Sequence, residues 1–265
     1  MASFLVADTS EDQCNSTLLG AFSQVVFFGR TYEEYLQMFP LLSDDKIAGN
    51  TILDCPGGPS AWTSVANNAL GMKAVAVDPI YAKPLSEIQA EARLAFQHVQ
   101  DKLICSPNAL HLDFDRAHYL ALKQRALESF LEDFVCQSDR YIAASLPTLP
   151  FADCQFDLVV SGHLLFVYAP LSTGGVAATG FDYDWHRAAF LELLRVTKRQ
   201  LLIFPATTFP PDKSGHVYIH QYAEKLVAEF GSMYSMDFYP SDYSQGCLSD
   251  EVFGLKVTVS TGEVS

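Results

Sequence analysis

The chain has 265 residues, of which 49% are apolar and 18% charged, and its formal net charge is -14. This composition is typical of an ordinary globular protein and excludes a disordered one. The negative charge repels phosphate backbones, so we expect no nucleic-acid partner. It favours a neutral or cationic small-molecule ligand, or simply solubility.

The N-terminus and the cysteines indicate a cytoplasmic protein. The first residues lack a basic region and meet Asp8 and Glu11 too early for a signal peptide. No apolar run reaches the roughly 18 residues that span a bilayer, so we expect no membrane partner. The six cysteines form no C-x-x-C pair, which argues against a zinc ribbon and a disulfide-stapled secreted domain. They are Cys14, Cys55, Cys105, Cys136, Cys154 and Cys247.

Short apolar segments alternate with helical ones along the chain. The predicted strands are 51–54, 73–78, 141–145, 156–161 and 200–205, with a closing antiparallel pair at 233–239 and 252–260. The predicted helices are 31–39, 59–70, 85–103, 183–197 and 218–230. This alternation predicts one α/β domain over residues 1–265, with a doubly wound, mostly parallel sheet of seven strands.

Two segments lie outside this minimal pattern. Residues 1–48 precede the first strand, and we expect them to form an N-terminal helical cap. Within residues 106–138, apolar side chains repeat at helical spacing, which predicts a helical insertion. We expect this insertion to lie over the ligand cleft, and the alternative is a surface for forming a homodimer. The repeating side chains are Leu120, Leu127, Phe130, Leu131 and Phe134.

The first strand ends in an acid and a glycine-rich turn that runs directly into a helix. Asp54 is followed by Cys55, Pro56, Gly57 and Gly58. Residues with little side chain let the backbone approach a ligand, and amides at a helix start favour an anionic or polar group. A purely structural turn is the alternative.

The second strand also ends in an acid, Asp78, at 24 residues from Asp54. A carboxylate at this place can accept hydrogen bonds from ribose hydroxyls, so the pair indicates an adenosine-type ligand. The alternative is an Asp that caps a helix. A dinucleotide is disfavoured because the turn lacks G-x-G-x-x-G and a pyrophosphate would lie beside Asp54. The ammonium group of a zwitterionic ligand could instead pair with that carboxylate.

Residues 146–161, LPTLPFADCQFDLVVS, complete a third motif. Together with the turn after Asp54 and with Asp78, this run resembles the class I S-adenosylmethionine (SAM)-dependent methyltransferases over residues 50–205. The resemblance implies a Rossmann-like methyltransferase fold, SAM as cofactor, and transfer of its methyl group to a small-molecule acceptor. Two positions depart from the family's acid-x-Gly-x-Gly-x-Gly pattern, because Pro56 and Ser60 replace the first and third glycines, and Pro56 also lacks an amide donor.

The resemblance also implies a set of cofactor contacts. Asp54, Gly57 and Gly58 would surround the methionine end, with Tyr32 or Tyr35 at its carboxylate, and Asp78 would bind the ribose. The remaining implied cofactor contacts are Cys55, Pro56, Pro79, Ile80, Ser145, Leu146, Ser161 and Gly162.

The candidate for proton removal is His163, which follows the fourth strand and titrates in the right range for a general base. A His that only packs or orients the cofactor is the alternative. Tyr168 and Trp185 are candidates for the acceptor pocket, although aromatic side chains at such positions are commonly core. We predict no metal site: His216, His220 and Glu224 share helical spacing, but a solvated polar face explains them equally well.

Two other functions remain open. An aminopropyltransferase has a related fold and uses decarboxylated SAM, but it needs a further acidic motif, for which Asp182 and Asp184 are weak candidates. A degenerate SAM-binding protein without activity would be compatible with Pro56.

Overall fold

The computed structural model describes most of the chain. The described residues are 25–44, 47–105, 115–177, 181–207, 224–225, 228–229, 233–243 and 253–259. The N-terminal cap is therefore described only from residue 25, and the predicted helix 218–230 lies mostly outside the described residues, as do His216 and His220.

Seven strands form one sheet in the order β3-β2-β1-β4-β5-β7-β6. They are β1 (Thr51–Asp54), β2 (Lys73–Val77), β3 (Tyr141–Ile142), β4 (Phe156–Gly162), β5 (Thr197–Phe204), β6 (Tyr234–Pro240) and β7 (Phe253–Val259). The first five strands are parallel, whereas β7 runs antiparallel to both β5 and β6. This confirms the predicted doubly wound, mostly parallel, seven-stranded fold. The strand order reverses between β1 and β4, and ligands of such sheets bind at the carboxyl ends of the strands there.

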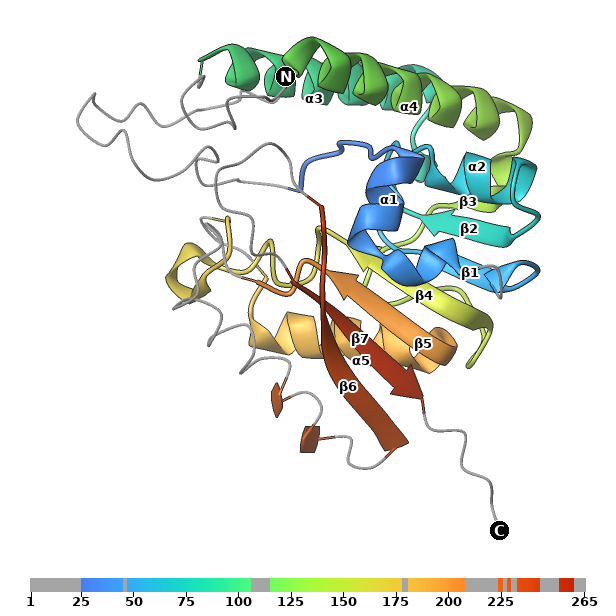
Figure 1. Cartoon of the computed structure of the whole chain (residues 1–265), viewed down its shortest axis with the longest axis vertical. Helices are drawn as coiled ribbons and strands as arrows, with labels where there is room; N and C mark the ends of the chain where they lie inside the picture. The colour runs from blue at the N-terminus through green and yellow to red at the C-terminus, as the bar shows by residue number, and fades with distance from the viewer. Residues whose placement is uncertain are drawn as a thin grey trace.

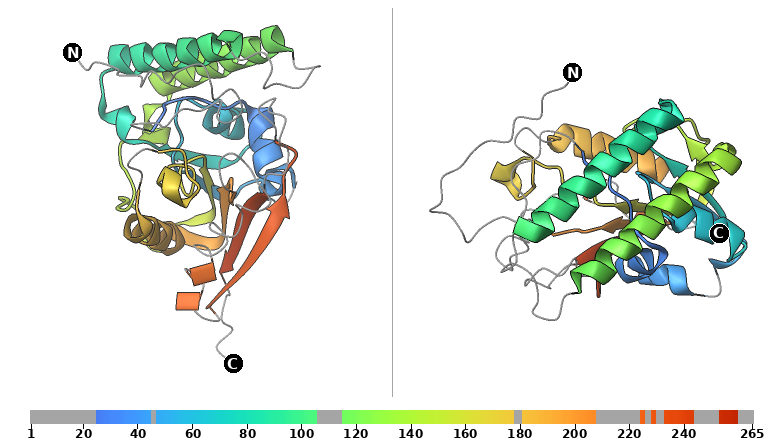
Figure 2. Two further views of the ribbon diagram at one scale, coloured as in Figure 1. Left: turned by 90° about the vertical axis from the view of Figure 1, so that its left-hand side faces the viewer. Right: turned by 90° about the horizontal axis from the view of Figure 1, so that it is seen from above.

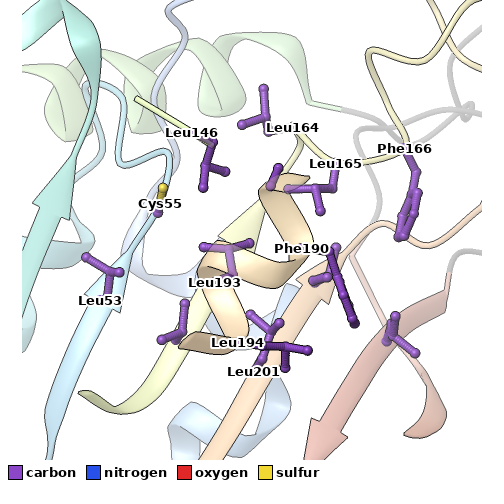
Figure 3. Packing of buried hydrophobic residues seen from close by; sticks show 14 of the residues in the cluster. Leu53, Cys55, Leu146, Leu164, Leu165, Phe166, Phe190, Leu193, Leu194 and Leu201 are labelled. Atoms are coloured by element: carbon purple, nitrogen blue, oxygen red, sulfur yellow. The ribbon is translucent and has the colours of Figure 1, made fainter. Parts of the chain in front are cut away.

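The central strands are apolar on both faces because helices cover both. Leu53, Val159 and Leu201 pack with α5 (Tyr183–Val196), and Figure 3 shows its Phe190 and Leu193 over the sheet. The opposite face packs against α1 (Tyr32–Met38) and α2 (Trp62–Asn68). Neighbouring residues of one strand thus serve different cores, as the two-residue period of a strand requires.

The predicted starts of two helices are confirmed by side-chain caps. The Thr31 hydroxyl accepts from the Glu34 amide, while the Glu34 carboxylate accepts from the Thr31 amide, which is a capping box for α1. Asp182 caps α5 by accepting from the Trp185 amide. None of the described helices is long and apolar enough to cross a membrane.

Two long helices, α3 (Leu85–Cys105) and α4 (Arg116–Cys136), connect β2 to β3. They lie side by side next to the β3 edge of the sheet (Figures 1 and 2). The apolar stripe predicted within 106–138 is confirmed, because Phe130 is fully buried with Leu127, Leu131 and Phe134 around it. The Phe130 ring contacts those of Tyr81 and Tyr141, with centroids 6.0 and 5.5 Å apart. The second half of α4 is therefore part of the core beside β2 and β3.

Residues 143–155 connect β3 to β4 without an α-helix. The side chain of Arg195 in α5 holds this loop by donating to the Phe151 and Leu149 carbonyls and to Asp153. Glu192 pairs with Arg195 and accepts from the Leu149 amide at 2.6 Å. The motif before β4 is thus fixed to α5 by Arg195 and Glu192.

Phe130→Ala should lower the free energy of unfolding by about 3–5 kcal/mol, because it leaves a cavity under Tyr81 and Tyr141. Urea denaturation followed by circular dichroism measures this loss. Val135→Ala, at a side chain 59% exposed on the same helix, is the control and should change stability by no more than about 0.5 kcal/mol. A loss below about 1 kcal/mol for Phe130→Ala would show that α4 is not part of the core.

Candidate active site

Asp54 ends β1 at the point where the strand order reverses. Its side chain is 1% exposed. The Tyr35 hydroxyl donates to Oδ2 at 2.7 Å, whereas Oδ1 has no hydrogen-bond partner among the described residues. Burial raises the pKa of this carboxyl to about 8, against the lowering effect of the Tyr35 hydrogen bond and with a further increase from the Asp78 charge. The group is therefore largely protonated at neutral pH, although the carboxylate is the form that would bind a cation.

The turn after Asp54 lies between the two neighbouring strands. The Cys55 amide donates to the Val160 carbonyl and the Gly57 amide to the Val77 carbonyl. A Cβ on Gly57 would meet the Cβ of Ala76 at 2.6 Å, and Gly58 has a φ of +54°. The backbone of the turn itself thus requires glycine at both positions, so the alternative of a structural turn explains part of the glycine pattern.

Asp78 joins this turn to the end of β2. Its Oδ1 accepts from the Ile80 amide at 3.0 Å and its Oδ2 from the Gly58 amide at 3.3 Å. It therefore caps the short helix Pro79–Ala82, as the alternative interpretation proposed. Burial raises its pKa to about 6, so the half-buried group is mostly ionised at neutral pH and keeps lone pairs for a further donor.

The chain before α1 is fixed to the glycine-rich turn. The Arg30 amide donates to the Ser60 hydroxyl at 3.1 Å, and the Ala61 amide donates to the Arg30 carbonyl at 3.0 Å. The Tyr35 ring stacks on Trp62, with centroids 5.3 Å apart. Ser60, which replaces a glycine of the family pattern, therefore holds the N-terminal segment against the turn.

His163 follows β4 with a φ of 56°, a conformation that non-glycine residues rarely adopt. Its amide donates to the Phe204 carbonyl at 2.6 Å, and its ring lies 5.4 Å from that of Tyr243. Burial, followed by the charges of Arg30 and Lys123, lowers the pKa of His163 well below its ordinary value. The imidazole is therefore neutral at physiological pH.

Other predicted contacts lie around this edge in different environments. Ser145 and Pro79 are exposed, Gly162 is half-buried, and Ile80 is 8% exposed. Leu146 and Cys55 belong to the same core cluster, where Figure 3 shows them close together.

The two predicted acceptor-pocket aromatics are engaged within the protein. The Tyr168 hydroxyl accepts from the Val26 amide at 2.9 Å, which joins the loop after β4 to the N-terminal segment. Trp185 stacks on Phe181 with centroids 3.7 Å apart. Beside Trp185, the buried His186 accepts from the Phe166 amide through Nε2 and so fixes the same loop.

Buried polar atoms without a partner gather at this edge. Buried polar groups are nearly always hydrogen-bonded, so each exception needs an explanation. Within the described ranges, all such atoms belong to the segment before α1, to the start of α2, or to residues at the carboxyl ends of β1, β4 and β5. They are Arg30 Nε, Asp54 Oδ1, Trp62 Nε1, Ser161 Oγ and Thr207 Oγ1. The unmet hydrogen-bonding capacity therefore lies where this fold class binds its ligands.

The sequence interpretation missed three charged residues at this edge: Arg30, Glu34 and Lys123. Lys123 of α4 is 3% exposed, and its Nζ lies 2.5 Å from the Glu34 carboxylate. Burial, followed by the charge of Arg30, lowers the pKa of Lys123 to about 7. Only Glu34 carried a sequence signal, as the acid of a capping box. Arg30 and Lys123 gave none, because tertiary packing alone brings α4 to α1.

Comparisons with known proteins find one relative by sequence and several similar solved structures. No family model matches the chain. An uncharacterized protein of Methanocaldococcus jannaschii is 27% identical over 192 residues, which are 71% of this chain and 81% of that protein. A SAM-dependent methyltransferase from Methanosarcina mazei has a TM-score of 0.45 at 13% identity, covering 84% of this chain and 99% of that chain. Magnesium protoporphyrin IX methyltransferase from Synechocystis, with bound S-adenosylhomocysteine (SAH), has a TM-score of 0.44 at 12% identity, covering 86% and 84%.

Asp54→Asn should change how stability depends on pH. The folded protein keeps a proton on Asp54 between about pH 4 and pH 8 that the unfolded chain releases, so this group lowers stability progressively as the pH rises through that window. Asn cannot ionise, and the variant should gain in melting temperature over the wild type from pH 5 to pH 8.

Asp157→Asn is a control of opposite sign. Burial raises the pKa of Asp157, but the hydrogen bonds from Thr51 and the interactions with Lys198 together outweigh burial and lower the pKa. Its loss should destabilise the protein at neutral pH and have little effect at acidic pH. If the melting temperatures of Asp54→Asn and the wild type change with pH in the same way from pH 5 to pH 8, Asp54 is not buried in its protonated state.

Proposed function

We propose that this protein transfers the methyl group of SAM to a small-molecule acceptor. The observation that carries the proposal is the buried Asp54 carboxyl, whose Oδ1 has no partner among the described residues at the strand-order reversal. The protonated acid leaves a buried polar atom unsatisfied, and its ionised form is costly unless a cation meets it.

The residues at the turn fit the two polar ends of SAM. The ammonium of the methionine end would pair with Asp54 Oδ1, while the Tyr35 hydroxyl holds Oδ2. The pairing would lower the Asp54 pKa and favour its ionised form. Asp78 would accept from the ribose hydroxyls with the lone pairs that Ile80 and Gly58 leave over.

The cofactor itself supplies an electrophilic methyl group, and the protein has to align the acceptor and take its proton. His163 suits the second task because its imidazole is neutral at physiological pH and lies at the end of β4. The segment before α1, fixed to Ser60 and to Tyr168, would exclude water from the reaction. Residues 106–138 would contribute to the same enclosure through the first half of α4, and a dimer contact on α4 remains the alternative.

Two observations bear on the alternatives. Asp182, a candidate for the acidic motif of an aminopropyltransferase, is used as the cap of α5. The low pKa of His163 makes it a weaker base than expected from the sequence, so the degenerate binding protein stays the alternative. We further propose a cytoplasmic location without a nucleic-acid or membrane partner, which follows from the composition.

Calorimetry should detect binding of SAM and SAH to the wild-type protein and none of NAD. Asp78→Asn, which keeps an acceptor for the Ile80 amide, should weaken SAH binding about tenfold or more, because a hydrogen bond to a carboxylate contributes about 1.5–3 kcal/mol. Asp139→Ala, at an exposed acid, is the matched control and should bind SAH as the wild type does. Tight NAD binding with no response to SAM at millimolar concentration would refute the proposed function.

His163→Gln should abolish transfer while leaving the SAH affinity within about twofold, because a general base acts on the acceptor and a positioning group acts on the cofactor. The measurement uses an acceptor found by screening a metabolite panel with radiolabelled SAM. The low pKa of His163 also predicts that the wild-type rate stays constant as the pH falls from 8 to the ordinary histidine value of 6.5. A variant that transfers normally would leave His163 with a packing role only.

A further inference from the structure

The positive charges at the site lie together on the N-terminal segment and on α4. The Arg30 guanidinium carbon lies 5.5 Å from the centre of the Phe28 ring, and Lys123 Nζ lies 5.0 Å from the same centre. Glu34 neutralises Lys123 through contacts of 2.5 Å from both carboxylate oxygens. When Lys123 is protonated, the cluster of Arg30, Lys123 and Glu34 therefore keeps one positive charge in a chain whose net charge is -14.

Arg30 carries that unbalanced charge. Its contacts are two long ones from Nη1, of 3.4 Å each, to the Phe28 and Gly29 carbonyls, and its Nε is buried without a partner. None of the described acids forms an ion pair with it. A guanidinium presents donors in a fork that matches a carboxylate or phosphate. Within the described residues, the Arg30 guanidinium thus has carbonyl acceptors but no anionic one.

Arg30 lies between the glycine-rich turn, to which its backbone is bonded through Ser60 and Ala61, and the group of side chains around the end of β4. After the effect of burial, the charge of Arg30 lowers the pKa of His163 and of Tyr168. In turn, four side chains favour the charged form of Arg30: Tyr243, Glu34, Tyr119 and Tyr35. Tyr243 joins this group to the candidate base, because its ring lies 5.4 Å from that of His163 and its hydroxyl 3.5 Å from Glu34. The Arg30 backbone is fixed to Ser60, so its side chain starts from a defined place.

We propose that the methyl acceptor is an anion, and that Arg30 binds its carboxylate or phosphate group beside His163. This inference rests on the proposed methyl transfer and names its substrate class. It replaces the expectation of a neutral or cationic ligand, because the charge of a whole chain does not describe the charge of one site.

The test is binding of model anions to the wild-type protein, with and without saturating SAH. The probes are acetate, benzoate and inorganic phosphate, with acetamide and benzamide as neutral partners of the first two. Titration by protein NMR should show benzoate or acetate binding about tenfold or more tightly than its amide, as expected for a charge-assisted, two-pronged contact.

Arg30→Gln should remove this preference, and Arg30→Lys should keep part of it. Arg199→Gln, which removes the same charge from an exposed position in β5, should behave as the wild type. Melting temperatures of all variants show whether they fold. If Arg30→Gln does not fold, the comparison of Arg30→Lys with the wild type is the test.

Three results would overturn the proposal. The first is a wild type that prefers none of the anions, and the second is an unchanged preference in Arg30→Gln. The third is a large loss of SAH affinity in Arg30→Gln together with no anion preference in the wild type. The third result would assign Arg30 to the cofactor instead. Absence of SAH binding to the wild type would count against methyl transfer alone, because the titrations without SAH still report on Arg30.

Discussion

The desolvation of Asp54 is the constraint on which the site depends. A carboxyl group at the centre of the sheet, 1% exposed, cannot keep its charge without a partner, and its pKa of about 8 expresses that cost. Tyr35 satisfies only one of its oxygens, and it can do so only while α1 lies against Trp62 and the turn. The same few contacts therefore hold the N-terminal segment in place and set the hydrogen bonding of Asp54 at the end of β1.

The site is electrostatically divided. Asp54 and Asp78 lie at the ends of β1 and β2, whereas Arg30 and Lys123 lie at the N-terminal segment, where Lys123 contacts Gly29 and Glu34. Such a division suits a reaction between a cationic cofactor end and an oppositely charged acceptor. Burial, together with the charges of Arg30 and Lys123, keeps His163 uncharged. A neutral imidazole there adds no third positive charge to a region that already has an excess.

The sequence predicts the sheet well because strand signals are local: apolar runs, acids at two strand ends, and turn residues between them. The helical stripe containing Phe130 was predictable for the same reason. Arg30, Lys123 and Tyr81 were not, because their roles come from contacts across long stretches of chain, such as Lys123 with Glu34, 89 residues apart. Trp185 lies in the first turn of α5 and stacks on Phe181, and its place in the acceptor pocket stays a prediction. The contacts of individual residues with cofactor and acceptor remain predictions.

The pairing of β1 with β4 has a consequence for how the protein acquires its site. Asp54 lies beside Val160, more than a hundred residues later, and the Cys55 amide completes the turn only by donating to that residue. Closing so long a loop costs chain entropy before any contact stabilises it, which makes such pairings slow to form. A nascent chain that has emerged through β3 can form its first strands and helices but has no finished glycine-rich turn. The binding site therefore comes into existence only after synthesis has passed β4, so a ligand can stabilise the nearly complete fold but cannot guide its early steps.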